Sequence, residues 1–302
     1  MAIVRHYGIL LCLVSATASA MTIHDTSSPG YLTGNASYTG VASIVGNYIA
    51  GGSFGCSGAL VSPTVILTAG HCVAPANSWD VTFQTASGFA TIGVSSAEVH
   101  PLFANRASNP AIQEYDIAIL RLATVAPGDA SIYTIADGSA PISFSDTTGT
   151  VVDMVGYGLG GNPSGALPGG TRRMAQNRLF GILGGEVDNP LLTAHNFASA
   201  SEPANYGIVA AGDSGGAMLV NNVIIGIASA STIPQLSSGT YTSGFYYGLH
   251  TSLYDEATRN WTSSAISEIP EPETYLLFAS GLSAVLILRR RRSQSMKTTL
   301  VR

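Results

Sequence analysis

Residues 212–217 read Gly-Asp-Ser-Gly-Gly-Ala (GDSGGA). Taken alone, the string has two interpretations, because glycine, aspartate and serine are also the usual residues of tight turns. Ser214 is then either a nucleophile or a small residue in a glycine-rich loop. A serine hydroxyl is a weak nucleophile at neutral pH and needs an adjacent base to take its proton. The choice depends on whether the rest of the chain supplies that base.

Two other segments supply the partners that a nucleophilic serine requires. Residues 67–72 (LTAGHC) end an apolar run at His71, and residues 116–122 (DIAILRL) begin one at Asp116. Histidine suits the role of base because its pKa lies near neutral pH, and a buried aspartate fixes the imidazole tautomer. Each residue alone also suits a structural role, as a packed histidine or a turn cap. The three motifs together, in the order His, Asp, Ser, favour a catalytic triad.

With these motifs, the chain resembles the trypsin/chymotrypsin family of serine endopeptidases over about residues 40–266. The resemblance implies an all-β fold of two six-stranded antiparallel β-barrels, with His71 and Asp116 on the first and Ser214 on the second. It implies hydrolysis of protein or peptide substrates through an acyl-enzyme. No cofactor is expected, and no metal site is expected either, because no metal-ligand spacing stands out in the sequence and Asp80 and Glu98 are too sparse to support a calcium loop. The backbone N–H groups of Gly212 and Ser214 would form the oxyanion hole.

The resemblance also assigns supporting residues. Asp213 is the residue that, in the family, pairs with the N-terminal amine released by zymogen cleavage. Gly156-Tyr157-Gly158 is similar to the family's Gly-Trp-Gly segment, with tyrosine in place of tryptophan. Ser229 resembles the serine that hydrogen-bonds the catalytic aspartate, and it is also placed near the substrate pocket.

Substrate preference is expected to depend on the residue six positions before the nucleophile, which here is Ile208. No carboxylate stands there to receive an arginine or lysine side chain. We therefore predict a preference for an apolar or aromatic side chain before the scissile bond. The other residues assigned to this pocket are Val209, Ala211, Ser229 and Gly244.

The cysteine count predicts one disulfide. Of the three cysteines, Cys12 lies in the predicted leader, and Cys56 and Cys72 remain as an even pair in an exported chain. The pair also matches the family's disulfide beside the catalytic histidine. Two cysteines without a second pair of ligands make a poor zinc site.

The composition favours short strands and turns, with 34 glycines, 14 prolines and only 10% charged residues. A C-terminal helix is expected over Leu253–Ile266, a crossing between the halves over Ala123–Asp146 and an exposed loop over Asn162–Gly170. Runs rich in Val, Ile and Tyr predict the strands. These runs are Val41–Ile44, Ala59–Val61, Val65–Thr68, Val81–Phe83, Ile117–Leu122, Val151–Tyr157, Ile208–Ala210, Met218–Val220, Val223–Ala228 and Gly244–Leu249.

The charge of the central region excludes some partners. Residues 21–268 hold six arginines, no lysine and sixteen acidic residues, which gives a net charge of −10. Such a domain is a poor match for nucleic acid or an anionic membrane surface.

Both ends of the chain carry export features. Arg5, a short apolar run and Ala18-Ser19-Ala20 make residues 1–20 similar to a secretory signal peptide, with an uncleaved N-terminal anchor as the alternative. Pro270-Glu271-Pro272, the 14-residue apolar stretch Tyr275–Leu288 and Arg289–Arg292 together resemble a PEP-CTERM sorting signal of Gram-negative bacteria. A plain C-terminal membrane anchor is the alternative there.

These features predict the organisation and location of the chain. Signal peptidase and an exosortase are the expected processing enzymes, and the C-terminal segment is the expected contact with the membrane. The protein is expected in the cell envelope or outside the cell. The expected parts are a signal peptide at 1–20, a protease-like domain at 21–268 with its halves meeting near 123–146, a sorting segment at 269–292 and a short tail at 293–302.

The activation site departs from the family pattern. Ile44-Val45-Gly46 is similar to an activation sequence, but it lies only 27 residues before His71 and is expected within the first strand. Cleavage after Ala20 would begin the mature chain at Met21. One hypothesis is that this end, or one trimmed to Ile23, reaches Asp213 directly. The alternative is a site organised without that ion pair.

Two other functions compete with the enzyme. One is a non-catalytic binding protein of the envelope or matrix on a protease fold, because a fold does not fix a function. The other is a structural component of an extracellular matrix, which the tail alone would suit. Degenerate members of the family usually lose a triad residue, so the complete set at His71, Asp116 and Ser214 favours the enzyme.

Overall fold

The structure is a computed structural model that describes residues 21–104, 115–162, 165–182, 191–196, 203–231 and 245–267. The predicted leader (1–20) and the predicted sorting segment and tail lie outside these residues. The contacts divide the chain into two units, residues 1–263 and 264–302. The barrels and the site described below belong to the first unit. None of the helices in the described part of the chain has the length and hydrophobicity that a membrane crossing requires.

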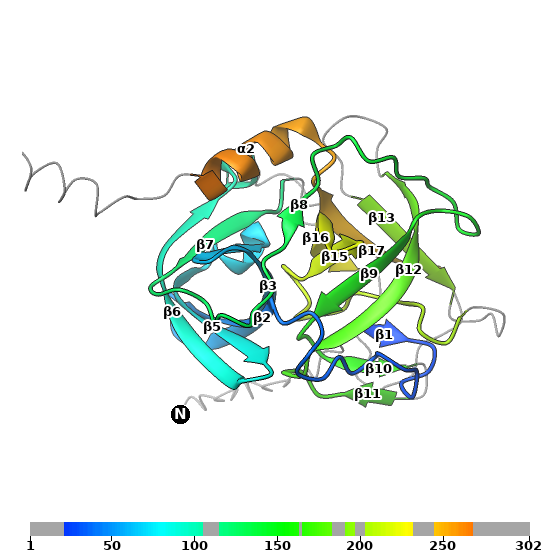
Figure 1. The fold of residues 1–302 in the computed structure, drawn as a ribbon, viewed down its shortest axis with the longest axis horizontal. Coiled ribbons are helices and arrows are strands. Elements are labelled where there is room, and N and C mark those ends of the chain that lie inside the picture. The colour runs from blue at the N-terminus through cyan, green and yellow to red at the C-terminus, as the bar shows by residue number, and fades with distance from the viewer. Residues whose placement is uncertain are drawn as a thin grey trace, which may run out of the picture. The chain divides into compact units, whose positions relative to one another are not determined.

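Six antiparallel strands form a first, closed barrel (Figure 1). Adjacent residues such as Ile66 and Leu67 are both fully buried, as are Ile119 and Leu120. Since neighbouring side chains on a strand point to opposite faces, both faces of these strands are covered. The strands are β2 (Val41–Tyr48), β3 (Ser53–Ser62), β4 (Val65–Thr68), β5 (Ala76–Thr85), β6 (Gly88–Val99) and β7 (Ala118–Leu122), in the order β2-β3-β4-β7-β6-β5.

The second half contains another cycle of six antiparallel strands. The pairings run β15-β9-β12-β13-β17-β16, and β16 pairs back with β15. A short strand, β8 (Thr134–Ile135), adds to β16 in parallel. The cycle consists of β9 (Val151–Gly156), β12 (Arg173–Ile182), β13 (Leu191–Asn196), β15 (Ala217–Val220), β16 (Val223–Ser231) and β17 (Phe245–Ser252). The predicted two-barrel fold is therefore confirmed, with β8 as an addition.

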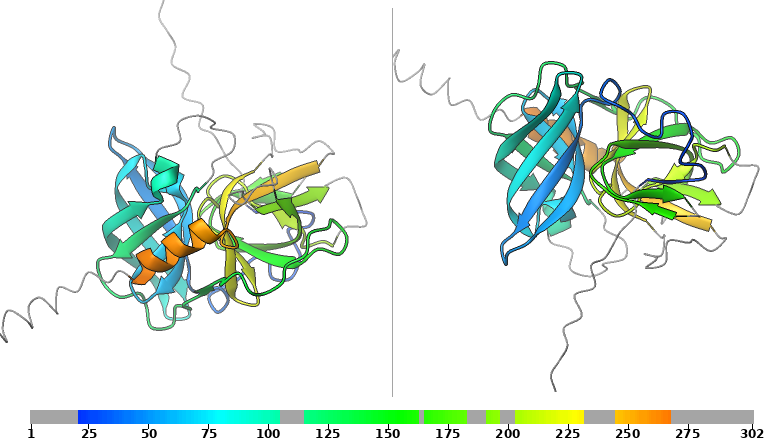
Figure 2. Two further views of the ribbon diagram at one scale, coloured as in Figure 1. Left: turned by 90° about the horizontal axis from the view of Figure 1, so that it is seen from above. Right: turned by 90° about the horizontal axis from the view of Figure 1, so that it is seen from below.

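The N-terminal segment joins the second half of the fold. In both views of Figure 2, the dark-blue N-terminal segment lies against the green strands. Its strand β1 (Thr22–Ile23) pairs in parallel with β10 (Gly160–Asn162) and antiparallel with β14 (Gly207–Ile208). Strand β11 (Gly165–Leu167) pairs with β10. The loop predicted over Asn162–Gly170 is thus wrong in part, because this stretch contributes to a small hairpin.

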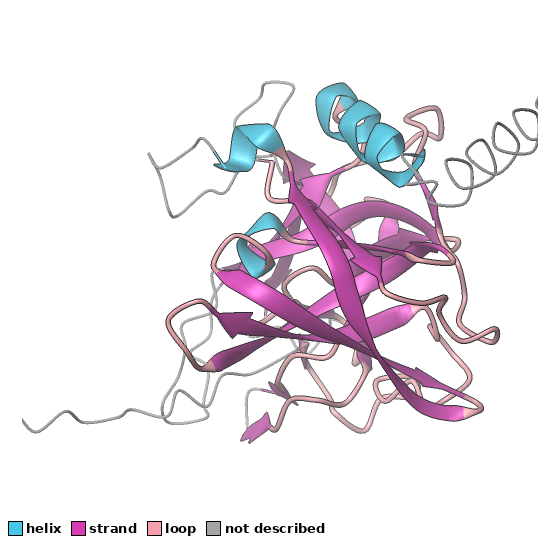
Figure 3. Cartoon of the chain, turned by 90° about the vertical axis from the view of Figure 1, so that its left-hand side faces the viewer, coloured by secondary structure: helices cyan, strands magenta, loops and turns pink. Residues whose placement is uncertain are grey.

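Helices are few beside the strands (Figure 3). A 3-10 turn, η1 (Gly70–Cys72), follows β4, and α1 (Pro101–Ala104) follows β6. The C-terminal helix α2 spans Glu256–Ser267, three residues later than its predicted start. Asp255 sets this start, because its Oδ2 accepts the N–H of Thr258 at 2.6 Å and so caps the first turn.

A buried arginine connects the two halves. Arg172 is 1% exposed, and its guanidinium donates to the carbonyls of Gly34 and Gln84 at 2.7 Å each. It also donates to Thr33 Oγ1 at 2.9 Å and to the Tyr157 hydroxyl at 3.2 Å. These acceptors come from the N-terminal segment, the first barrel and the second half, so one side chain fixes three parts of the fold.

Candidate active site

His71 and Asp116 meet at the end of β4 and the start of β7. His71 Nδ1 lies 2.7 Å from Asp116 Oδ2, and the His71 backbone N–H donates to Asp116 Oδ1 at 2.8 Å. Because an ionised carboxylate only accepts hydrogen bonds, Nδ1 carries the proton and Nε2 keeps its lone pair. The Asp116 side chain is fully buried, whereas that of His71 is 29% exposed. Asp116 therefore orients the imidazole from the interior of the protein, and the opposite side of the ring is accessible from outside.

Two hydroxyl groups of the second half hold Asp116. Ser229 Oγ on β16 donates to Asp116 Oδ2 at 2.6 Å, and Thr251 Oγ1 on β17 donates to the Asp116 carbonyl at 3.0 Å. The carboxylate therefore accepts three hydrogen bonds, two from His71 and one from Ser229. Hydrogen bonds to a charged acceptor are roughly twice as strong as neutral ones.

Ser57 of the first barrel holds the loop that carries Ser214. The Ser57 N–H donates to the Ser214 carbonyl at 2.7 Å, and the Ser57 hydroxyl donates to the Gly212 carbonyl at 3.0 Å. The same hydroxyl accepts the N–H of Tyr157 at 2.9 Å. Since Ser57 adjoins Cys56, which is bonded to the neighbour of His71, these contacts bring the backbone of Ser214 to the His71 region.

The backbone of this loop needs glycine at a specific point. Gly215 has φ +83° and packs against Thr68 and the Ser57 carbonyl, so a side chain there would be strained and would clash. The turn continues with the Gly215 N–H bonded to the Ala228 carbonyl at 2.7 Å. Among the described residues, the N–H groups of Gly212 and Ser214 donate to no protein acceptor. Both N–H groups remain available to an external oxygen atom.

Asp213 lies behind this loop in a fully buried position. Its Oδ2 accepts the N–H of Met21 at 2.7 Å and that of Ala210 at 3.0 Å, and its Oδ1 accepts the N–H of Gly158 at 3.0 Å. Burial raises the pKa of this carboxyl to about 6 despite these donors. Gly156 completes the environment, because any side chain at that position would collide with the Asp213 carboxylate.

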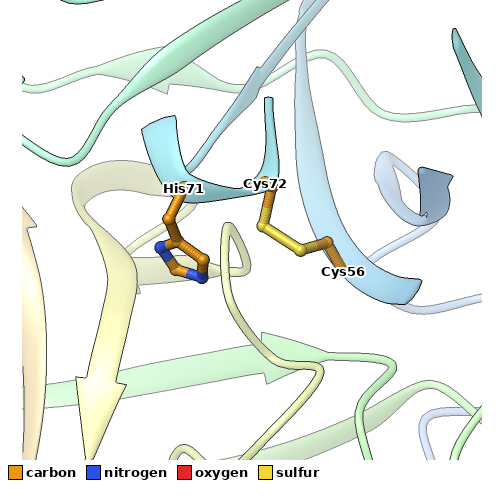
Figure 4. Close-up of side chains that lie close together, drawn as sticks. All are labelled: Cys56, His71 and Cys72. Atoms are coloured by element: carbon orange, nitrogen blue, oxygen red, sulfur yellow. A yellow bond between two sulfur atoms is a disulfide. The ribbon is translucent and has the colours of Figure 1, made fainter. Parts of the chain in front are cut away.

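The predicted disulfide between Cys56 and Cys72 is present (Figure 4). Its Cα atoms are 6.3 Å apart, and it ties β3 to η1, the turn that carries His71. The two sulfur atoms and a His71 ring nitrogen lie within 4.8 Å of one another, a spacing at which three such atoms could hold a metal ion. Both sulfurs are engaged in the disulfide, so this group offers no thiolate ligand.

The predicted pocket residues differ in how deeply they are buried. Ile208 is fully buried and packs with Tyr246, and Val209 is also buried, while Ala211 is half-buried. Ser229 reaches Asp116, as the family resemblance implies. Gly244 lies outside the described residues.

Sequence reasoning missed three residues of the site. Ser57 holds the Ser214 loop, Thr251 holds Asp116, and Tyr31 donates its hydroxyl to the Met21 carbonyl at 2.9 Å. Ser57 had a usable signal, since it follows Cys56 directly. Thr251 and Tyr31 had none, because each donates to a backbone carbonyl, which no side-chain motif marks.

Comparisons with known proteins match both the folded region and the C-terminal segment. The Trypsin family model matches residues 33–252, and the PEP-CTERM protein-sorting motif matches residues 268–292. Trypsin beta and trypsin alpha of Drosophila erecta are each 24% identical to this chain over 187 residues. The aligned region is 59% of this chain, 69% of trypsin beta and 68% of trypsin alpha.

Solved structures share the fold at lower identity. Neuropsin, a serine protease expressed in the limbic system of mouse brain, has a TM-score of 0.58 at 19% identity, covering 79% of this chain and 99% of its own. HL collagenase has a TM-score of 0.56 at 18% identity, covering 78% and 98%. The Trypsin match covers most of the sequence, and the chain therefore belongs to the trypsin family and carries a PEP-CTERM sorting motif.

Proposed function

We propose that this protein is an exported serine endopeptidase that acts through His71, Asp116 and Ser214. One observation carries the proposal, namely the 2.7 Å contact of His71 Nδ1 with the fully buried Asp116 carboxylate. A buried carboxylate that faces an accessible imidazole is expensive to maintain without a function. The complete triad in an intact family fold argues against the binding-protein alternative.

The reaction follows from the placement of each group. His71 Nε2 takes the proton of the Ser214 hydroxyl as the oxygen attacks the peptide carbonyl, and Asp116 stabilises the imidazolium that forms. The N–H groups of Gly212 and Ser214 stabilise the oxyanion, and each such donor contributes roughly 3 kcal/mol. His71 then returns the proton to the leaving amine, which leaves an acyl-enzyme on Ser214. Water enters by the reverse route and releases the acid.

The sorting motif supports a location at the cell envelope. Signal peptidase removes the leader, and an exosortase processes the tail at the cell envelope of a Gram-negative bacterium. The acidic domain then acts on proteins or peptides in the envelope or outside the cell.

Labelling with a fluorophosphonate probe tests the activity, since such probes react with an activated serine and not with an ordinary hydroxyl. The exported, processed protein is compared with Ser214→Ala and His71→Ala. Ser95→Ala is a matched control, because the Ser95 hydroxyl bonds only to backbone carbonyls on β7, at Arg121 and Leu122. We expect labelling in the parent and the control, and its loss in both triad variants. A folded, processed parent that does not react would support the binding-protein alternative.

A further inference from the structure

The turn that presents Asp116 to His71 is strained. Tyr115 has φ +53°, a left-handed conformation that is an outlier for a bulky side chain. The Ile117 N–H donates to the Tyr115 carbonyl at 2.8 Å, which closes a γ-turn with Asp116 at its centre. Backbone strain of this kind persists only where the surrounding structure enforces it. The groups that hold Tyr115 in this conformation therefore bear on the position of the Asp116 carboxylate.

His100 packs directly on Tyr115. The two rings are stacked, with centroids 4.7 Å apart and planes inclined by 8°. The Trp261 ring of α2 meets the His100 ring edge-on, with centroids 4.9 Å apart. His100 is 3% exposed and Tyr115 is 4% exposed, and aromatic contacts at these separations add to the stabilisation that burial provides. The Tyr115 ring is therefore held beside Asp116 by a ring that is itself held by α2.

The backbone and the ring nitrogen of His100 fix it in this place. The His100 N–H donates to the Ile117 carbonyl at 3.0 Å. Nδ1 accepts the N–H of Leu102 at 3.3 Å, so this nitrogen carries no proton and the ring is neutral. Burial lowers the pKa of His100, and the opposing charge of Asp255 is the smaller influence. Both effects of burial and hydrogen bonding thus favour an uncharged ring that can stack in the core.

The short helix α1 extends these contacts to the other member of the pair. The Phe103 N–H donates to the His100 carbonyl at 3.0 Å. The Phe103 ring packs on Gly70, where an added Cβ atom would lie 2.7 Å from it. Gly70 directly precedes His71 in η1. One turn of chain therefore contacts the backbone beside His71 through Phe103 and the backbone beside Asp116 through His100.

We propose that His100 is a positioning residue of the proposed triad, which holds Tyr115 in its strained conformation and so keeps the Asp116 carboxylate against His71. His100 acts through Tyr115 and is not assigned a contact with substrate. The inference rests on the proposed function for its effect on catalysis. The contact between His71 and Asp116 can be followed without catalysis.

Steady-state kinetics with a peptide ester measures the catalytic effect. His100→Leu removes the ring but keeps an apolar side chain. We expect kcat to fall about tenfold or more with KM within about twofold, because the weakened interaction is the one between Asp116 and the His71 imidazolium of the transition state. Phe83→Leu is the matched control, since Phe83 is fully buried on β5, which pairs with β2 and β6 rather than with β4 or β7. The control should lower the midpoint of urea unfolding and leave kcat within about twofold.

Two further variants test whether the ring contact is the cause. His100→Phe keeps a ring against Tyr115 and Trp261 and loses the Nδ1 acceptor, so we expect kcat within about threefold of the parent. Tyr115→Leu removes the other ring and should lower kcat about as much as His100→Leu. The double variant should lose no more than either single one, because both changes remove the same contact. Tyr115→Leu also tests the contact if His100→Leu does not fold.

The His71 Nδ1 proton gives a measurement that needs no catalysis. It lies between Nδ1 and the buried Asp116 Oδ2, which are 2.7 Å apart, and its low-field NMR signal reports exchange with water. The signal is followed in the Ser214→Ala chain. We expect His100→Leu in that background to speed the exchange about tenfold, because Asp116 is held less firmly. Phe83→Leu in the same background should leave the exchange near the parental rate.

Failure of the inference can be told apart from failure of the proposed function. A folded His100→Leu protein with parental kcat and parental proton exchange would overturn the inference. An effect confined to KM, no rescue by His100→Phe, or additive losses in the double variant with Tyr115→Leu would also overturn it while the proposed function stands. A folded, processed parent without esterase activity would overturn the proposed function, and the proton exchange in the Ser214→Ala chain would still decide the role of His100.

Discussion

Ser229 Oγ donates a 2.6 Å hydrogen bond to Asp116 Oδ2, the same oxygen atom that faces His71 Nδ1. Ser229 lies on β16 of the second half, whereas Asp116 and His71 belong to the first barrel. The base of the proposed triad is therefore oriented across the junction of the two barrels. Any loosening of that junction will reach His71, the proposed catalytic base, through this bond.

Ser229→Ala is expected to lower kcat/KM by roughly tenfold to a hundredfold with little change in KM. A hydrogen bond to a charged acceptor contributes about 1.5–3 kcal/mol, and the carboxylate would keep only its two bonds from His71. Steady-state kinetics with a peptide ester measures the effect, and Ser95→Ala is the control. A variant with parental kinetics would remove Ser229 from the positioning of Asp116.

Replacement of both cysteines by alanine is expected to lower the free energy of unfolding by about 3 kcal/mol, as the chain-entropy description gives for a short loop. Cys56 and Cys72 are 16 residues apart and tie β3 to η1. Because η1 carries His71, fluorophosphonate labelling should also become slower. Urea unfolding monitored by circular dichroism gives the stability, and an unchanged midpoint would contradict the expectation.

The sequence predicts five of the six strands of the first barrel, and the motifs of the site, because their signals are local. Strands such as Val65–Thr68 are continuous apolar runs, and both of their faces are covered in the fold. The residues of the proposed triad stand in short motifs whose order alone indicates the family. Each motif is ambiguous alone, and Asp116 and Ser214 are identified by the order in which the three motifs occur along the chain.

Strands without a continuous apolar run are not predicted by the same reasoning. In β12 (Arg173–Ile182) the inward positions include Arg173 and Asn177, which are buried because they bond to backbone carbonyls such as that of Gly207. Strand β6 (Gly88–Val99) is not predicted either, and its residues alternate between half-buried and exposed positions, with none fully buried. Burial of polar residues such as Arg173 and Asn177 depends on acceptors supplied by distant segments, which no local pattern encodes.

Arg172→Met is expected to destabilise the protein by about 3 kcal/mol, because it removes the donor to the carbonyls of Gly34 and Gln84 and to the buried Tyr157 hydroxyl. Arg178→Met is a matched control, since its described side-chain bond is a single one to the Gly149 carbonyl. We expect the control to lose about 1 kcal/mol in the same urea titration. Similar losses in both variants would show that Arg172 does not link the halves of the fold.

His250 should make the protein sensitive to acid. Complete burial lowers its pKa to about 3, so the folded state holds it neutral while the unfolded chain binds a proton below about pH 6.5. The unfolded state thus carries more protons between about pH 6.5 and 3, and stability falls as the pH is lowered through that window. His250→Phe should flatten this dependence in urea titrations between pH 4 and 7, relative to the parent. A parental slope in the variant would assign acid sensitivity to other groups.

The pocket expected beside Ile208 should select apolar side chains before the scissile bond. Ile208 and Tyr246 pack together there, and neither offers a charge to an incoming arginine. Burying an unpaired guanidinium costs several kcal/mol, so cleavage after Phe or Leu should exceed cleavage after Arg by at least a hundredfold in a peptide library. Ile208→Asp should raise cleavage after Arg relative to Phe by at least tenfold. Because Ile208 pairs with Thr22 of β1, circular dichroism and the urea midpoint of that variant verify that it is still folded. A library dominated by cleavage after Arg in the parent enzyme would refute the preference.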